Sequence, residues 1–358
     1  MLPLLLACAL PLPPVANADD ADFPTWDAVD AEILAEMERR DLVAVSACVA
    51  QDGVLLWCQG YGWADLESET PATVDTPFLL ASMSKPITTA GVLVGAEQGY
   101  VALDAPIQSQ AVGLDPQTTL THLLTHTASL EDDLDALYAA TSADIEPDLE
   151  GWLPQELARE DLSTGEPLGS SWQYSNTGIA LAALELQLAT QTPFDVWLEQ
   201  ELFAPLGLSV SLEPPPETAL RYPDSRSWEA EELVRSHAWP AGFLYTTAQD
   251  YTSLLVAIDE DTLFEADGMT HAATEATDFG FLPYLEQGLG FQRFEDVGDR
   301  EVWGHMGGFY GTNTIGLLAP DSGLAVVVLS TGGPAPGYRA WKSLTAMAEV
   351  VLDEAQAQ

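Results

Sequence analysis

The hydrophobic pattern changes along the chain, and β-rich runs occur near both ends. Residues 42–50 and 54–61 are rich in apolar and β-branched residues, and turn residues at 51–53 separate them, which predicts a hairpin. Three more strands are predicted near the C-terminus, at residues 302–306, 312–318 and 325–330. We therefore predict one antiparallel sheet built from both ends of the chain.

The long middle of the chain has helical patterns instead. Residues 27–40 place Val29, Ile33 and Met37 on one stripe, as an amphipathic helix does. Residues 82–98 form a mostly small and apolar run that ends at a glycine, which also predicts a helix. Further helices are predicted at residues 120–124, 134–140, 178–189 and 336–354.

Together these elements predict an α/β fold, an antiparallel sheet flanked by helices with an inserted all-α lobe. The α/β lobe takes residues 27–80 and 290–355, and the helical lobe takes residues 81–289. Prolines 214–216 form a rigid break, and residues 217–294 mix loops and short helices.

Charge excludes one class of partner. The 358 residues carry 56 acidic against 11 basic side chains, a formal net charge of -45. Nucleic acid needs a basic face, which this chain lacks, and an anionic membrane surface is disfavoured for the same reason. The acid excess fits either an ordinary solvated surface or adaptation to salt, where screening lengths are short.

The N-terminus predicts export. Residues 2–12 are mostly apolar and a small-x-small sequence stands at 16–18, so residues 1–18 resemble a secretory signal. Residues 5–8 equally resemble a bacterial lipobox, in which Cys8 is lipidated, and a plain apolar end is the third interpretation. No later segment has the roughly 18 apolar residues of a membrane span. We expect a periplasmic, extracellular or lipid-anchored protein without a membrane span.

The remaining cysteines, Cys48 and Cys58, flank the predicted hairpin, and pairing in an oxidising compartment is one interpretation. A tight turn at Asp52-Gly53 places Cys48 opposite Trp57 rather than Cys58. Because a disulfide needs close and facing Cβ atoms, we expect two buried free thiols.

The first motif with catalytic chemistry is Ser82-Met83-Ser84-Lys85. Residues three apart share one face of a helix, so Ser82 and Lys85 are predicted to be neighbours. A serine hydroxyl is a weak nucleophile until a neighbour takes its proton, and a lysine with a lowered pKa is suited to that role. With only two lysines in the chain, a chance match is improbable.

Two later motifs carry complementary groups. Tyr174 is a candidate proton shuttle, and Asn176 offers both a donor and an acceptor to a substrate. His305 precedes Gly307 and Gly308 at the end of a predicted strand, where glycines let backbone N–H groups approach a ligand. One such N–H and that of Ser82 are suited to form an oxyanion hole.

The order and spacing of four segments resemble the serine β-lactamase and penicillin-binding protein family. The similarity is to the branch of class C β-lactamases, D-alanyl-D-alanine carboxypeptidases and esterases. It covers nearly the whole chain from residue 28, and it rests on residues 78–85, 123–127, 174–178 and 304–308.

The resemblance implies a role for each matching residue. Ser82 would be the acylated nucleophile, Lys85 would activate it, and Tyr174 would relay protons. Asn176 would orient the carbonyl side of the substrate. Gly308 would supply the second oxyanion N–H. The family's site lies between a sheet lobe and an all-α lobe.

His305 stands where class C β-lactamases carry a lysine. A neutral imidazole holds a substrate carboxylate less well than an ammonium does, and Arg293 is the nearest basic residue before the strand. We therefore expect an acyl-serine hydrolase that cleaves esters or amides of small acyl substrates, D-amino acids or cell-wall peptides. β-Lactams are expected to acylate Ser82 and turn over poorly. The alternatives are a weak β-lactamase and a non-catalytic penicillin or cell-wall binding protein.

No cofactor or metal is predicted. His122 and His126 are spaced as in some zinc helices, but the zincin glutamate between them is missing, and the resemblance makes this segment structural.

Overall fold

The computed structural model describes residues 25–109, 114–158, 162–225, 227–259, 274–275 and 284–358. The predicted signal or lipobox, with Cys8, lies outside the described residues. Within the described ranges, no helix is long and apolar enough to cross a membrane.

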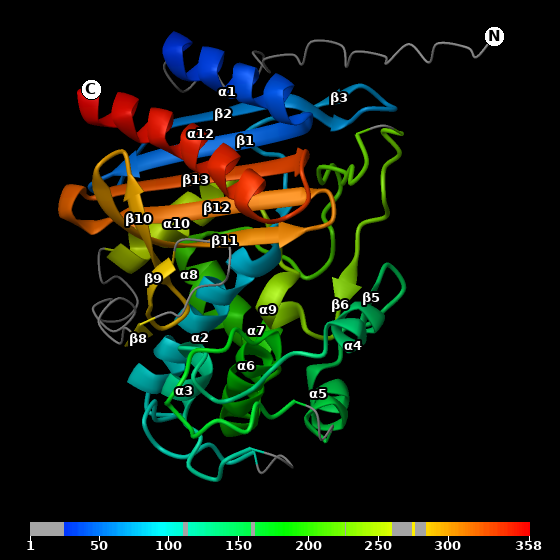
Figure 1. Ribbon diagram of the computed structural model, residues 1–358, viewed down its shortest axis with the longest axis vertical. Coiled ribbons are helices and arrows are strands. Elements are labelled where there is room, and N and C mark those ends of the chain that lie inside the picture. The colour runs from blue at the N-terminus through cyan, green and yellow to red at the C-terminus, as the bar shows by residue number, and fades with distance from the viewer. Residues whose placement is uncertain (1–24, 110–113, 159–161, 226, 260–273, 276–283) are drawn as a thin grey trace.

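Nine of the described strands form one large antiparallel sheet, and both ends of the chain contribute to it (Figure 1). Its order is β3-β2-β1-β13-β12-β11-β10-β9-β8. The bounds are β1 Leu42–Gln51, β2 Val54–Asp65, β3 Thr70–Pro71, β8 Thr274–Glu275, β9 Tyr284–Gln287, β10 Gln292–Val297, β11 Arg300–Phe309, β12 Thr312–Ala319 and β13 Leu324–Gly332. Because β1 pairs with β13, the predicted sheet of both chain ends is confirmed.

Helices cover both faces of this sheet. On one face α1 (Asp27–Arg40) and α12 (Tyr338–Ala357) contact each other, and they lie together across the strands in Figure 1. The predicted stripe of α1 is buried there in an apolar cluster with side chains of β1, β13 and α12. On the other face α10 (Ala248–Asp259) packs against β1, β12 and β13. The sequence analysis described that region only as loops and short helices.

The second lobe is helical, as predicted. Its helices are α2 Ser84–Glu97, α3 Leu120–Leu124, α4 Leu134–Ala139, α5 Leu149–Leu157, α6 Asn176–Thr190, α7 Phe194–Leu198, α8 Ala204–Leu206 and α9 Trp239–Gly242, with a π-helical turn at Glu199–Phe203. Two short ladders pair β4 Phe78–Leu79 with β7 Tyr245–Thr246, and β5 Thr141–Ser142 with β6 Arg235–Ser236. Two 3₁₀ turns lie at Ala81–Met83 and Pro320–Ser322.

Helix α2 is the centre of the helical lobe, and it contacts α6 and α9. Nearly all of its residues are buried, as expected for a helix that is apolar on all sides. Gly91 and Gly95 make this packing possible, because a Cβ at either position would overlap Leu198 or Leu186. The first turns of this buried helix carry the candidate catalytic residues.

The prediction of two free thiols is wrong, because Cys48 and Cys58 form a disulfide. The strands pair as expected next to the Asp52-Gly53 turn, but a β-bulge shifts the register between Val49 and Ala50. One extra residue on β2 therefore brings Cys58 opposite Cys48, with Cα atoms 4.1 Å apart.

Candidate active site

Ser82 lies on the 3₁₀ turn directly before α2, and contacts from distant segments hold this turn. Ala81 has a φ of 48°, a left-handed conformation that costs a non-glycine residue about 1–2 kcal/mol. The N–H of Leu80 donates to the carbonyl of Leu244 (2.9 Å), and the Thr314 hydroxyl donates to the carbonyl of Leu80 (2.7 Å). These tertiary contacts offset the backbone strain at Ala81 and fix the position of the Ser82 hydroxyl.

Lys85 is completely buried one helical turn later. Its Nζ lies 3.0 Å from Ser82 Oγ, 2.7 Å from Asn176 Oδ1 and 2.5 Å from the carbonyl oxygen of Ala241. Burial lowers the pKa of Lys85 to about 7, while the negative charge of Asp132 opposes that shift. The amine is therefore available as a base near neutral pH.

The phenol of Tyr174 lies beside this lysine. Lys85 Nζ is 4.7 Å from the centre of the Tyr174 ring, and the ring is near the imidazoles of His126 and His305, at centroid distances of 4.6 and 6.3 Å. The structure thus brings the serine, lysine, tyrosine and histidine of three separate motifs into one cluster.

His305 is buried on β11 and uncharged. Its Nδ1 contacts the carbonyl oxygen of Met306 at 2.6 Å, and this carbonyl can only accept, so Nδ1 carries the proton. Burial, with a smaller contribution from the charge of Lys85, lowers the pKa of His305 to about 3. A neutral imidazole therefore occupies the position at which class C β-lactamases carry a lysine.

Gly307 lets β11 come close to the Ser82 turn. A Cβ on Gly307 would overlap the carbonyl oxygen of Leu80 and the hydroxyl of Thr314. Gly308 is exposed and lines the same pocket as Ser82. The predicted oxyanion partners, Ser82 and Gly308, thus meet at one cavity.

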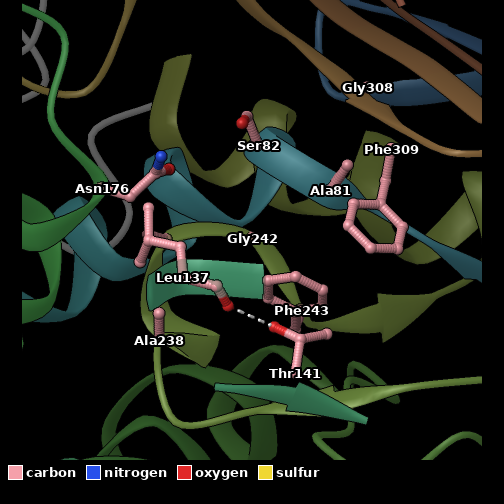
Figure 2. A pocket seen from close by; sticks show the side chains of 11 residues that line it. Ala81, Ser82, Leu137, Thr141, Asn176, Ala238, Gly242, Phe243, Gly308 and Phe309 are labelled. Atoms are coloured by element: carbon pink, nitrogen blue, oxygen red, sulfur yellow. Dashed lines mark hydrogen bonds between the residues drawn. The ribbon is translucent and has the colours of Figure 1, made fainter. Parts of the chain in front are cut away.

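The pocket beside Ser82 is largely apolar (Figure 2). Its cavity volume is about 110 Å³, and Figure 2 shows the rings of Phe243 and Phe309 across from Leu137. The two rings pack edge to face with centroids 5.3 Å apart. The described lining contains no charged side chain; it consists of Ala81, Ser82, Leu137, Thr141, Asn176, Ala238, Ala241, Gly242, Phe243, Gly308 and Phe309.

Arg293, the basic residue considered from the sequence, is held elsewhere. Its guanidinium makes two hydrogen bonds of 3.1 Å to the carboxylate of Glu286, and it does not line the described pocket. Arg221, which the sequence analysis did not consider, lies 5.1 Å from the centre of the Phe309 ring. It is 2% exposed, forms an ion pair with Glu231, and is not among the residues that line the described pocket.

Asp132 is a further residue of this site, and its role was not predicted from the sequence. This carboxylate accepts hydrogen bonds from the backbone N–H groups of Asn176 (2.7 Å) and Thr177 (3.0 Å), from Ser175 Oγ (3.0 Å) and from Asn176 Nδ2 (2.7 Å). These partners lie 43–45 residues later in the chain, so no local signal pointed to them.

The two histidines of the 122–126 segment have separate structural partners. His122 Nδ1 contacts the Thr119 hydroxyl at 2.7 Å in a capping box of α3, and His126 Nδ1 accepts from the N–H of Ser175. In the described part of the chain, no group of three or more His, Cys, Asp or Glu residues is arranged to hold a metal ion. His126 instead supports the segment that carries Tyr174.

Relatives with curated descriptions share part of this chain. Esterase EstB of Burkholderia gladioli is 35% identical over 221 residues, which cover 53% of this chain and 55% of the relative. The D-aminopeptidase of Gluconobacter oxydans is 26% identical over 79% of this chain and 55% of its own length. Penicillin-binding protein 4* of Bacillus subtilis is 28% identical over 45% of this chain and 36% of its length. The chain spans about half the length, or less, of these relatives.

Solved structures share the fold. The D-amino acid amidase of Ochrobactrum anthropi in complex with L-phenylalanine has a TM-score of 0.78 at 23% identity, covering 92% of this chain and 99% of its own. An octameric penicillin-binding protein homologue from Pyrococcus abyssi has a TM-score of 0.75 at 17% identity, and the match covers 93% of this chain and 78% of the homologue. The family model described as Beta-lactamase matches residues 29–347. This chain therefore belongs to the beta-lactamase family.

Proposed function

We propose that this protein is a serine acyl hydrolase that cleaves small, uncharged carboxylic esters through an acyl-enzyme on Ser82. The observation that carries the proposal is the 3.0 Å contact between Ser82 Oγ and the fully buried Nζ of Lys85. The relatives named esterase and D-aminopeptidase support acyl transfer to water as the reaction class.

Lys85 acts as the base of the first step. In its neutral form the amine has two N–H bonds and one lone pair, and two of its three neighbours, Asn176 Oδ1 and the Ala241 carbonyl, can only accept hydrogen bonds. The lone pair is thus left for the hydroxyl proton of Ser82. As Ser82 Oγ bonds to the acyl carbon, its proton passes to Lys85.

The remaining groups complete the exchange. The N–H groups of Ser82 and Gly308 are proposed to hold the oxyanion. The leaving alkoxide takes a proton from the Lys85 ammonium through Tyr174, and the alcohol departs. Water then attacks the acyl-enzyme, loses its proton along the same path, and releases the carboxylic acid and free Ser82.

The pocket favours an uncharged acyl group over an anionic one. Its walls are Phe243, Phe309 and Leu137, and His305 is neutral above pH 3 or so. A substrate carboxylate placed among these walls would lose its hydration without gaining a cation from them, which is costly. We therefore rank esters and amides of neutral acyl groups above β-lactams and free peptide C-termini.

A substrate panel tests this ranking. The enzyme is given short-chain nitrophenyl esters, a D-phenylalanine amide, a D-alanyl-D-alanine peptide and nitrocefin, at low and high salt. We expect the neutral esters to have the highest kcat/KM and nitrocefin to label Ser82 with slow turnover. Rapid nitrocefin hydrolysis would overturn the ranking, and absence of turnover with every substrate would favour the binding-protein alternative.

A fluorophosphonate label separates the catalytic and the non-catalytic alternatives at the residue level. We expect intact protein to be labelled once, and Ser82→Ala to be unlabelled. Labelling of the Ser82→Ala variant would show that another serine is the nucleophile.

We also propose that the protein is exported, as a secreted or lipid-anchored form. The Cys48–Cys58 disulfide supports this proposal, because disulfides persist in oxidising compartments. Mass spectrometry of the mature N-terminus distinguishes cleavage after residue 18 from lipidation of Cys8. An unprocessed cytosolic chain would contradict both.

A further inference from the structure

Asp132 joins two segments of the helical lobe at the N-terminus of α6. One carboxylate oxygen accepts from Ser175 Oγ and the Thr177 N–H, and the other accepts from both the backbone N–H and Nδ2 of Asn176. The contact to Nδ2 is more than a helix cap, because the Asn176 side chain also contacts the candidate base.

This contact fixes the orientation of the Asn176 amide. A carboxylate has only acceptor oxygens, so the amide must present its NH₂ group to Asp132. The amide oxygen then faces Lys85 Nζ at 2.7 Å. With the amide reversed, two oxygens would face each other at Asp132, and an N–H donor would face the lysine.

We propose that Asp132 is a positioning residue, which acts through the Asn176 amide to direct the lone pair of Lys85 at the Ser82 hydroxyl. The two N–H bonds of neutral Lys85 point to Asn176 Oδ1 and the Ala241 carbonyl, and only Ser82 is left to the lone pair. A reversed amide would donate to that lone pair and take it away from Ser82. The inference rests on the proposed function, since it assigns Lys85 the role of base.

The charge of Asp132 has a second effect on the same lysine. Burial lowers the pKa of Lys85 and the negative charge of Asp132 raises it again. The other titratable groups around the amine are Tyr174, under its Nζ, and the imidazoles of His126 and His305, whose pKa values burial and the Lys85 charge lower. Asp132 is thus the group whose anion opposes the desolvation of Lys85.

The variant Asp132→Asn tests the role in catalysis. It keeps the size of the side chain but has one acceptor oxygen instead of two, so the Asn176 amide loses its fixed orientation. We expect kcat to fall by about 10²-fold, the loss that a misplaced catalytic group causes, and the acid limb of kcat/KM to move to lower pH. The control is Asp148→Asn, which removes the carboxylate that caps α5 through the N–H of Gly151. It should keep the wild-type kcat and pH profile.

A double-mutant cycle separates positioning from simple helix capping. In an Asn176→Ala background, where the amide is absent, Asp132→Asn should reduce kcat by less than 3-fold further, because coupled residues are non-additive. A full additional 10²-fold loss in that background would overturn the proposal, as would wild-type kcat in Asp132→Asn alone.

Lysine NMR tests the same point without using activity. The chain has only two lysines, Lys85 and Lys342, so protein labelled with ¹³Cε-lysine gives two signals, and Lys342→Arg assigns them. We expect the Lys85 midpoint to decrease in Asp132→Asn and not in Asp148→Asn. An unchanged midpoint would overturn the electrostatic part. If the wild type hydrolyses no ester yet this shift is seen, the proposed function fails and the electrostatic effect of Asp132 on the lysine stands.

A charge-conserving variant covers the case in which Asp132→Asn does not fold. Asp132→Glu keeps the negative charge but lengthens the side chain by one methylene, which displaces the carboxylate. We expect a reduced kcat with a Lys85 midpoint near that of the wild type. Wild-type kcat in folded Asp132→Glu would overturn the proposal, because the position of the carboxylate would then be without consequence.

Discussion

The side chain of Lys85 donates a 2.5 Å hydrogen bond to the backbone carbonyl of Ala241, a residue 156 positions later in the chain. The neighbouring carbonyl of Pro240 accepts from the Thr88 hydroxyl at 2.6 Å, so α9 is attached to the first turns of α2 at two points. One hydrogen bond of the amine is therefore made to backbone, and the other acceptor is the side-chain Oδ1 of Asn176. That arrangement restricts its remaining free direction to Ser82.

Removal of the base should abolish most acylation without unfolding the protein. A positioned general base contributes about 10²–10⁴-fold to a rate, so we expect Lys85→Ala to slow fluorophosphonate or ester acylation of Ser82 by that factor. Circular dichroism checks the fold. The matched control is Lys342→Ala, the other lysine, which is exposed on α12; it should react like the wild type. A wild-type rate in Lys85→Ala would show that the base is another residue.

The rate should depend on pH through Lys85. Only the neutral amine accepts a proton, and burial lowers the pKa of Lys85 to about 7. We therefore expect kcat/KM for an uncharged ester to rise with pH and to reach half its maximum near pH 7. Acid release in a pH-stat measures this without an indicator. A half-maximum near pH 10, the range of an ordinary lysine, would contradict the buried base.

His305 should make the fold sensitive to acid. The folded state lowers the pKa of His305 from 6.5 to about 3, so below pH 6.5 the unfolded chain binds a proton that the folded chain does not. This contribution to stability is complete above pH 6.5 and is lost as the pH falls toward 3. When the pH is lowered from 7 to 5, we expect the free energy of unfolding to decrease by about 2 kcal/mol more in the wild type than in His305→Asn.

Urea unfolding at the two pH values measures this difference. The acidic side chains are common to both proteins, so their contribution cancels in the comparison. Equal losses for the wild type and His305→Asn would show that the imidazole titrates normally in the folded protein.

Gly307 should be indispensable for the geometry of the Ser82 turn. A methyl group there would overlap the Leu80 carbonyl and the Thr314 hydroxyl, whose hydrogen bond holds the turn against β12. We expect Gly307→Ala to lower kcat/KM by about 10²-fold, as a small displacement of a nucleophile does.

A glycine remote from the site provides the comparison. Gly99 has a φ of +79° and open space where a Cβ would stand, so Gly99→Ala introduces backbone strain without overlap. It should lower stability by about 1–2 kcal/mol and leave kcat/KM unchanged. Wild-type kinetics for Gly307→Ala would show that β11 and the Ser82 turn can move apart without an effect on kcat/KM.

The disulfide should contribute measurably to stability. Cys48 and Cys58 close a loop with a sequence separation of 10, for which chain entropy predicts about 3 kcal/mol. We expect the free energy of unfolding, measured with urea, to be lower by that amount in Cys48→Ser/Cys58→Ser and in the reduced wild type than in the oxidised wild type. Iodoacetamide should modify the two cysteines of the unfolded protein only after reduction. Modification without a reductant would contradict the disulfide.

Local patterns predicted much of the fold and the centre of the site. The stripe of Val29, Ile33 and Met37 has helical spacing, and α1 spans the predicted residues. Ser82 and Lys85 are neighbours because one α-turn separates them, which local helix geometry requires. Helix α10 was missed because its apolar residues lie in a region with many loop signals, and packing against β1, β12 and β13 stabilises it.

Other features depend on contacts between distant segments. The bulge on β2 adds one residue between the turn and Cys58, and neither its position nor the disulfide follows from the strand pattern. The partners of Asp132 are likewise remote in sequence, and its role depends on which way a single amide faces.

The amino-acid sequence by itself determined several helices, the sheet of both chain ends and the serine–lysine pair, because periodicity and helical spacing are local properties of the chain. The tertiary structure alone decided the protonation of Lys85 and His305, the orientation of Asn176 and the uncharged pocket. Burial and hydrogen-bond direction arise only when segments far apart in the chain exclude water from the same place.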